Sequence, residues 1–403
     1  MLSLSTVCFL GLQLTSLYAQ QVPVPFFAFL DPDALRNVSQ LISSKGYPVE
    51  EYEVITRDGF VLNVQRIPHG RDQFPVSPGK RREVVFLQHG LLSSSADWVM
   101  NFPDESLGYI LADAGYDVWL GNVRGNTYSH HLHYTRKDKE FWDFSFDDMI
   151  EYDLPAMLDF ILKVTGAPKL QYVGHSQGTL MLFGLLSEQP QYNEKIKLFS
   201  ALGPVSTVTY TISPIRLLAP WSKDLNFLFT LLGEHAFLPS NRFMKFLANT
   251  MCSFKISRLI CEDMIFLICG IDSKEMNETR LPVYISHTPA GTSVKNMVHY
   301  GQMIEEKSFS KFDYGWYKNE LAYGQMHPPE YNVSRTAVPV ALYWSQNDWL
   351  ADPKDVLLLK NKLPNVALYF EVPDKGFTHL DFVIGMHANK LVYPVVLKTM
   401  RDH

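Results

Sequence analysis

A serine set between two glycines, directly after a short apolar run, is the feature that most constrains this chain. Residues 170–173 (Leu-Gln-Tyr-Val) predict a strand, residues 174–178 (Gly-His-Ser-Gln-Gly) follow at once, and residues 178–188 predict a helix. In such a unit the serine lies on a tight, strained turn, and its hydroxyl projects above the sheet edge. The segment therefore predicts a strand–turn–helix unit with Ser176 as a candidate nucleophile.

The rest of the chain alternates strand-like and helix-like stretches from about residue 50 onward. Residues 52–64 predict a hairpin with an Asp-Gly turn, and residues 146–164 predict a long amphipathic helix. This alternation predicts an α/β fold with a mostly parallel central sheet and helices on both faces. Further strands are expected at 84–87, 117–120, 196–202, 338–344 and 366–372.

The interval from about residue 205 to residue 336 interrupts this rhythm. It is rich in Leu, Phe and Met, and it shows little strand alternation. We therefore expect a helical cap with a lid at 206–334, inserted between core segments at 20–205 and 335–403.

The first residues predict export. Residues 7–17 are mostly apolar, and a cleavage site after Ala19 predicts a signal peptide over 1–19. An N-terminal anchor is the alternative, although the run is short for a membrane span, and no other run is long enough. Sequons at Asn37, Asn277 and Asn332 fit glycosylation in the secretory pathway.

Charge and cysteine content argue against a nucleic-acid-binding protein and against a metalloprotein. The net charge of −6 does not suggest a nucleic-acid partner. Cys8 lies in the expected signal peptide, so one disulfide and one free thiol are expected among Cys252, Cys261 and Cys269. No His stands at zinc-ligand spacing near them, so we expect no metal and no cofactor.

A serine hydroxyl needs a neighbouring base, usually a His that a carboxylate orients. In a parallel-sheet hydrolase the acid and then the base follow the serine, each just beyond a late strand. Asp348 lies in the loop after the expected strand 338–344. Asp352 competes with it, but Asp352 precedes Pro353 and suits a helix N-cap. We predict Asp348 as the acid.

The loop after the expected strand 366–372 contains His379, which we predict to be the base. His387 lies farther on, in an expected helix. An oxyanion needs two donors. One is the backbone N–H of Gln177, and the other comes from the loop after 84–87, where Leu91 is the better candidate and Leu92 the alternative.

Together these motifs resemble the acid lipase family of animals, the group of gastric and lysosomal acid lipases. The resemblance covers about residues 38–397. Val123 departs from the usual Ser and Tyr300 from the common Trp, and residues 104–106 replace a frequent sequon, which leaves substrate preference and pH optimum open. The matching motifs lie at 85–92, 111–122, 124–127, 152–156, 174–178, 289–294 and 379–382.

The resemblance implies an α/β-hydrolase fold with a helical cap and lid over a deep acyl pocket. It implies the same nucleophile, acid and base, and the same two oxyanion donors, as the topology does. It also implies a disulfide between Cys252 and Cys261, which leaves Cys269 free. The family hydrolyses esters of neutral lipids at acid pH, so a secreted or lysosomal enzyme is expected.

We therefore expect a serine lipase that acts on triacylglycerols, cholesteryl esters or both at a lipid interface. A carboxylesterase for smaller esters is one alternative, and a non-catalytic lipid-binding protein is another. A dehalogenase or epoxide hydrolase would need Asp in place of Ser176. The expected lid lies between Pro220 and Gly270, and its apolar residues face either lipid or the cap interior: Leu225, Phe227, Leu228, Phe229 and Leu231.

Overall fold

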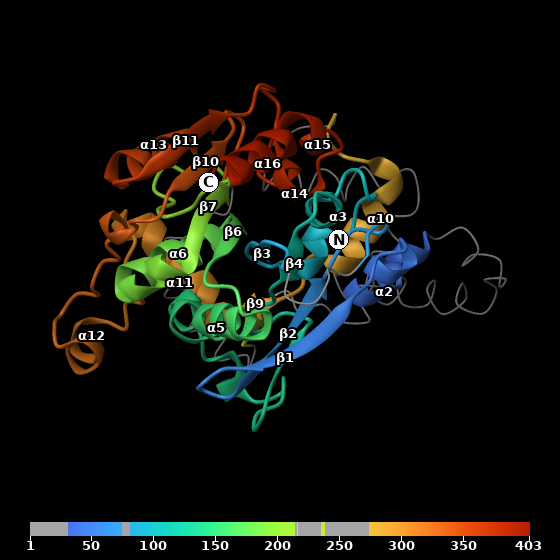
Figure 1. The fold of residues 1–403 in the computed structure, drawn as a ribbon. Coiled ribbons are helices and arrows are strands. Elements are labelled where there is room, and N and C mark those ends of the chain that lie inside the picture. Colours follow the sequence, from blue (N-terminus) through green and yellow to red (C-terminus); the bar gives the residue numbers. More distant parts are fainter. Residues whose placement is uncertain (1–30, 75–80, 214–215, 217–234, 238–273) are drawn as a thin grey trace, which may run out of the picture.

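A twisted central sheet organises the molecule. The computed structural model describes residues 31–74, 81–213, 216, 235–237 and 274–403. Within them a nine-stranded sheet has the order β1-β2-β4-β3-β6-β7-β10-β11, with β5 paired to β2 (Figure 1). The strands are β1 (Glu50–Ile55), β2 (Phe60–Ile67), β3 (Val84–Gln88), β4 (Asp117–Leu120), β5 (Ser129–His131), β6 (Leu170–His175), β7 (Ile196–Leu202), β10 (Val340–Trp344) and β11 (Val366–Glu371).

Six neighbouring strands, from β4 through β3, β6, β7 and β10 to β11, run parallel. The hairpin β1–β2 is antiparallel, with Glu50 opposite Arg66 and Ile55 opposite Val61, and it joins the sheet through β4. The predicted α/β class and mostly parallel sheet are confirmed. Every strand expected from the sequence is present, with ends that differ by up to three residues. Strand β5 was not expected.

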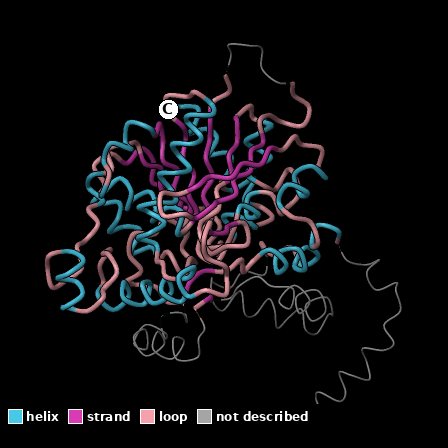
Figure 2. The backbone as a smooth tube through the Cα atoms, turned by 90° about the horizontal axis from the view of Figure 1, so that it is seen from below, coloured by secondary structure: helices cyan, strands magenta, loops and turns pink. Residues whose placement is uncertain are grey.

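Helices cover both faces of the sheet (Figures 1 and 2). One face packs against α4 (Phe146–Asp148), α5 (Leu154–Thr165), α6 (Gln177–Glu188), α11 (Val294–Glu306) and α13 (Pro353–Lys362). The other packs against α2 (Val38–Ser44), α3 (Leu107–Asp113), α10 (Leu281–His287), α14 (Asp381–Ile384), α15 (Ala388–Leu391) and α16 (Tyr393–Asp402). A further helix, α12 (Trp316–Tyr323), extends away from the sheet.

The expected helix over 146–164 is one helical stretch with a wider turn inside it. Between α4 and α5, residues Met149–Asp153 form a π-helical turn, η5. Pro155 follows within the first turn of α5, and it has no N–H to donate to the carbonyl of Glu151. The single-turn helices are η2 (Pro32–Ala34), η3 (Ser95–Trp98), η4 (Lys139–Trp142), η6 (Pro190–Lys195), η8 (Glu278–Arg280) and η9 (Val333–Arg335).

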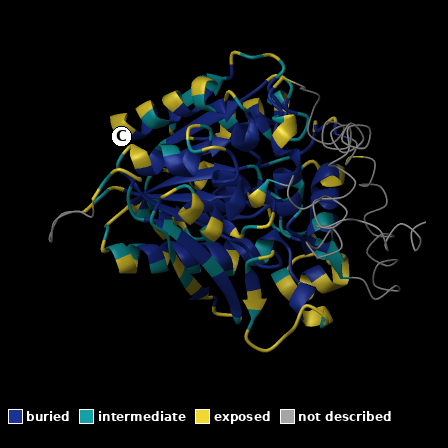
Figure 3. Cartoon of the chain, turned by 90° about the vertical axis from the view of Figure 1, so that its right-hand side faces the viewer, coloured by how far each residue is buried: buried dark blue, intermediate teal, exposed yellow. Residues whose placement is uncertain are grey.

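Strand alternation divides the apolar core between the two faces. In β3, Val84 and Phe86 pack on one face, whereas Val85 and Leu87 pack on the other. All four side chains are buried, as expected for parallel strands covered on both sides. Figure 3 shows the strands in the buried interior, beneath helices whose outer surfaces are exposed.

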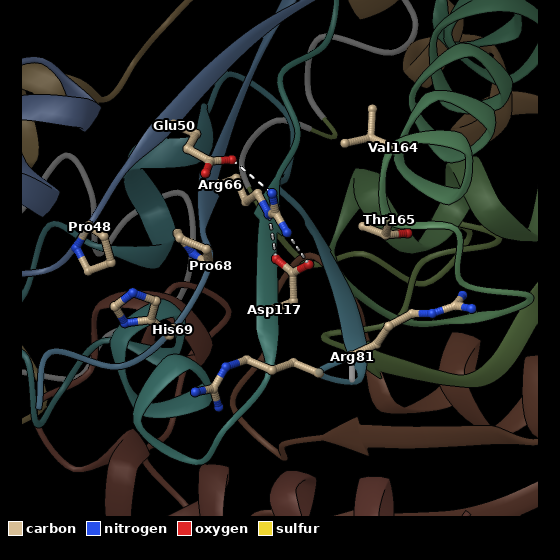
Figure 4. Close-up of a pocket in the computed structure, with 10 residues that line it drawn as sticks. Pro48, Glu50, Arg66, Pro68, His69, Arg81, Asp117, Val164 and Thr165 are labelled. Carbon is tan, nitrogen blue, oxygen red and sulfur yellow. Dashed lines mark hydrogen bonds and ion pairs between the residues drawn. The ribbon is translucent and has the colours of Figure 1, made fainter. Parts of the chain in front are cut away.

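A pocket of about 460 Å³ lies at the amino ends of the parallel strands (Figure 4). Arg66 extends across it and pairs with Glu50 and with Asp117, the first residue of β4. The Arg66 guanidinium is thus held between two carboxylates, and Arg81 and Arg82 also line the pocket. It lies at the sheet edge opposite to Ser176, which follows the carboxyl end of β6, so it belongs to a different part of the molecule from the predicted site.

Candidate active site

Ser176 occupies the turn between β6 and α6. Its backbone has φ 52° and ψ −118°, a strained conformation for a residue with a side chain. Both glycines of the motif are required by close backbone contact. A Cβ on Gly178 would lie 2.3 Å from the carbonyl oxygen of Gln88, and one on Gly174 would lie 2.8 Å from the carbonyl carbon of Gly178. The turn has the geometry that the sequence predicts.

The predicted acid and base meet across two neighbouring loops. Asp348 follows β10, His379 follows β11, and His379 Nδ1 lies 2.7 Å from Asp348 Oδ2. Both side chains are buried, with 1% and 2% of their surface exposed. Asp348 Oδ1 also accepts hydrogen bonds from the backbone N–H groups of Leu350 (2.9 Å) and Ala351 (2.7 Å). The carboxylate is therefore held in one orientation toward the imidazole.

The second ring nitrogen of His379, Nε2, is available to accept a proton. Among the described residues Nε2 has no hydrogen-bond partner, although it is buried. Gly203, just after β7, makes room for the ring: a Cβ there would lie 3.1 Å from His379 Cε1 and 3.3 Å from Asp348 Oδ2. The same end of β7 holds the serine, because Ser176 N–H donates to the carbonyl of Leu202 at 3.1 Å.

The competing candidates lie outside this cluster. Asp352 caps α13, where its side chain accepts from Lys354 N–H at 2.8 Å, as its Pro neighbour predicts. His387 lies in a turn between α14 and α15 and not within a helix, and its Nδ1 lies 3.0 Å from Glu275 Oε1. Geometry therefore favours Asp348 and His379 over their rivals.

The loop after β3 approaches the serine closely. A Cβ on Gly90 would lie 3.1 Å from Ser176 Cβ, so a side chain at residue 90 would crowd the nucleophile. Gln177 begins α6, and its backbone N–H has no partner inside that helix. Leu92 has φ 62°, and its carbonyl accepts from Ala290 N–H at 2.7 Å. Assignment of Leu91 and Gln177 as oxyanion donors remains a prediction.

Two buried histidines support the site, and sequence reasoning gave them no such role. His175 Nε2 donates to the carbonyl of His379 at 2.9 Å, and burial lowers the pKa of His175 well below its usual value, so the ring is neutral. His89 Nδ1 donates to the carbonyl of Gly90 at 2.8 Å, and burial lowers the pKa of His89 to about 4. The His175 ring therefore links the serine turn to the loop after β11, and His89 Nε2 accepts from Val123 N–H at 3.3 Å, which links the loop after β3 to the loop after β4.

A buried carboxyl behind the same loop predicts a dependence of stability on pH. Asp97 accepts a hydrogen bond from the Ser93 hydroxyl, and burial raises its pKa to about 7. Because the folded-state pKa exceeds the unfolded value, the folded state binds the proton more tightly. The contribution of Asp97 to stability should therefore decrease as pH rises from about 4 to about 7. This carboxyl accounts for at most about 4 kcal/mol of that loss.

Asp97→Asn should remove this loss, so that from acid to neutral pH the unfolding free energy of the variant falls less, or rises more, than that of the wild type, as measured by urea unfolding. Asp104→Asn removes an exposed carboxylate nearby and serves as the matched control. Equal pH slopes in the wild type and Asp97→Asn would contradict the prediction.

Several predictions fall outside the described residues. The signal peptide, the disulfide between Cys252 and Cys261, and the lid residues between Pro220 and Gly270 all lie there. The sequon residues Asn37 and Asn332 are exposed and Asn277 is half-buried, and their glycosylation stays a prediction. In the described ranges no group of His, Cys, Asp or Glu is arranged to hold a metal ion. Every helix in those ranges is too short or too polar to cross a bilayer.

The fold and the site together define a class. A parallel sheet with a serine on the strained turn after β6, and with an acid and a histidine after the two last strands, is the arrangement of the α/β-hydrolases. A family model described as "alpha/beta hydrolase fold" matches residues 83–382, and another, "partial alpha/beta-hydrolase lipase region", matches residues 38–102. A candidate lipase from Sulfolobus solfataricus, 17% identical, has a similar fold, with a TM-score of 0.55 over 88% of this chain and 99% of that one.

Closer relatives narrow the class. Human gastric triacylglycerol lipase is 49% identical over 92% of this chain and 92% of its own length. Human lysosomal acid lipase/cholesteryl ester hydrolase is 43% identical over 93% of both chains. Lipase lipl-1 of Caenorhabditis elegans is 43% identical over 92% of this chain and 93% of its own. The chain belongs to the α/β-hydrolase fold family and, within it, to the acid lipases of animals.

Proposed function

We propose that this chain is a serine lipase that hydrolyses the carboxylic esters of neutral lipids through an acyl-enzyme on Ser176. The pairing of His379 with Asp348, both buried beside the strained serine turn, carries the proposal. The names of the human relatives support triacylglycerols and cholesteryl esters as the substrate class.

The proposed reaction uses the free nitrogen of the histidine. His379 Nε2 takes the proton of the Ser176 hydroxyl, whose oxygen then attacks the ester carbonyl. Asp348 keeps the proton on Nδ1 and stabilises the imidazolium that forms. The backbone N–H groups of Leu91 and Gln177 bind the oxyanion. The imidazolium protonates the leaving alcohol, and water then releases the fatty acid from the acyl-enzyme by the same steps.

The proposal includes the setting of the enzyme. Residues 206–334 form the cap, the core consists of 20–205 and 335–403, and the substrate is met at a lipid interface. The expected signal peptide and sequons favour the secretory pathway, with a secreted or lysosomal enzyme as its product. The names of the gastric and lysosomal relatives fit both destinations.

Hydrolysis of triolein and of cholesteryl oleate by the purified protein, from about pH 4 to about pH 8, tests this function. We expect fatty acid release from at least one substrate, and at least a ~10³-fold lower rate for Ser176→Ala. Ser176→Ala should unfold at the temperature of the wild type. Release that survives this substitution would contradict the proposed nucleophile.

The alternatives give different results. A lipase whose lid opens at an interface should increase sharply in activity above the solubility of a short-chain ester, whereas a carboxylesterase for small esters should saturate smoothly on monomers. A non-catalytic lipid-binding protein should not react with a fluorophosphonate. If the fluorophosphonate labels the wild type at Ser176 but does not label Ser176→Ala, a non-catalytic lipid-binding protein is excluded.

A further inference from the structure

The side chain of Gln177, next to the nucleophile, is held from outside the sheet core. Gln177 Oε1 accepts from Asn296 Nδ2 at 3.0 Å and from the Tyr300 hydroxyl at 3.2 Å. Its Nε2 lies 3.5 Å from Met149 Sδ. Gln177 is 1% exposed, so these hydrogen bonds are shielded from water. Two segments far apart in sequence, α11 and the π-helical turn η5, thus converge on the residue whose backbone N–H is a proposed oxyanion donor.

Asn296 and Tyr300 are four residues apart in α11, so they share one helix face. Figure 1 shows α11 beside α6, the helix that Gln177 begins. The Tyr300 ring also packs edge-on against Phe146 at 5.5 Å, which fixes the position of its hydroxyl. The two donors therefore reach the Gln177 amide from a packed helix and not from a loose loop.

The first turn of α11 is held by hydrogen bonds to the residues just before it. Asn296 Nδ2 lies 3.1 Å from Thr292 Oγ1, and Asn296 N–H donates to Ser293 Oγ at 2.9 Å. Thr292 and Ser293 form β9, which pairs with β8 (Ala236–Phe237). The donors on Gln177 are thus continuous with a hydrogen-bonded segment of the expected cap.

The turn that they hold needs such support. Ser176 is strained, and no side chain caps the first N–H groups of α6. Rotation of the peptide between Ser176 and Gln177 would turn the Gln177 N–H away from the oxyanion. A side chain fixed at its far end restricts that rotation.

We infer that Asn296 and Tyr300 are positioning residues for the reaction: they fix the Gln177 side chain and thereby aim its backbone N–H at the oxyanion. The inference rests on the proposed function, in which Ser176 is the nucleophile and Gln177 an oxyanion donor. It couples α11, in the expected cap, to transition-state stabilisation in the core.

The test compares catalysis with substrate affinity on a soluble short-chain ester. Loss of an oxyanion donor costs ~10²–10³-fold in kcat, and a misplaced donor costs less. We therefore expect Asn296→Ala to lower kcat about 10-fold, and Asn296→Ala with Tyr300→Phe about 100-fold. KM should stay within about twofold, because the ground state does not need the oxyanion donor. Affinity for a boronic acid, which forms a tetrahedral adduct on serine, should weaken in parallel with kcat.

A double-mutant cycle assigns the effect to Gln177. Gln177→Met keeps the backbone N–H but removes the side-chain acceptor, so adding Asn296→Ala to it should cause no further loss. Gln302→Leu is the matched control: Gln302 lies on the same helix and bonds to the backbone of Asp313, away from Gln177. It should leave kcat unchanged.

The possible outcomes distinguish failure of the inference from failure of the proposed function on which it rests. If a fluorophosphonate labels Ser176 but Asn296→Ala with Tyr300→Phe keeps the wild-type kcat and boronate affinity, the inference alone fails. If kcat falls equally in the Gln302→Leu control, Asn296 and Tyr300 have only a structural role and the inference fails. It also fails if the loss of kcat in their variants follows the loss of melting temperature and nothing else. If wild-type Ser176 is not labelled, the proposed function fails.

Discussion

Replacing Asp348 by Asn should lower kcat about 10⁴-fold, with little change in folding. The geometry gives the reason. Asp348 Oδ1 is held by the backbone N–H groups of Leu350 and Ala351, so the carbonyl oxygen of an Asn would remain there. Its NH₂ group would then face His379 Nδ1. The imidazole would carry its proton on Nε2, where it cannot accept one from Ser176.

Asp352→Asn is the matched control for this prediction. Asp352 caps α13, and Asn caps a helix about as well as Asp, so kcat should stay within about twofold. Both variants should be assayed on a soluble ester, with the melting temperature measured alongside. A large loss in Asp352→Asn, or near-normal turnover in Asp348→Asn, would show that the wrong aspartate has been assigned.

Arg124→Met should destabilise the folded protein by about 3–5 kcal/mol, a large part of the stability of a typical domain. The Arg124 side chain is 1% exposed and pairs with Asp153, which is fully buried, at 2.7 Å, and with Asp58 at 2.7 Å. It joins the β1–β2 turn, the loop after β4 and the start of α5. Removing the guanidinium leaves the Asp153 carboxylate buried without its cation, as urea unfolding at neutral pH should show.

The loss of stability in Arg124→Met should become smaller at acid pH. Burial raises the pKa of Asp153 although Arg124 opposes the shift, and removing Arg124 raises it further. Because the folded-state pKa lies above the unfolded value, the penalty is present at neutral pH and disappears as Asp153 is protonated. Adding Asp153→Asn should recover part of the stability. Lys195→Met breaks an exposed pair with Asp159 and should cost less than about 1 kcal/mol. Equal losses in the two single variants would contradict the argument.

Local signals carried much of the fold and the proposed site. The run before Gly174 predicts a buried strand because parallel strands are apolar on both faces. Ser176 is marked by two glycines that close backbone contacts require, and Asp352 by the Pro that follows it. These signals are short-range consequences of sterics and capping, so they can be read along the chain.

Other features depend on contacts between distant segments. Nothing adjacent to His175 indicates that its ring reaches the carbonyl of His379, 204 residues away. The pairing of Arg124 with Asp58 and Asp153 likewise carries no local pattern. His387 was expected inside a helix, but it lies in a turn where Glu275, from a distant segment, binds both its ring and its backbone N–H.

The amino-acid sequence by itself determined the α/β class, the strand–turn–helix unit around Ser176, and the order of the acid and base behind it. Only the tertiary structure decided that Asp348 and His379 meet at 2.7 Å, and that Asn296 and Tyr300 hold the neighbour of the serine. The physical reason is the distance along the sequence over which each interaction acts. Steric and capping preferences act within a few residues, whereas burial and hydrogen bonding depend on which distant segments the packed sheet brings together.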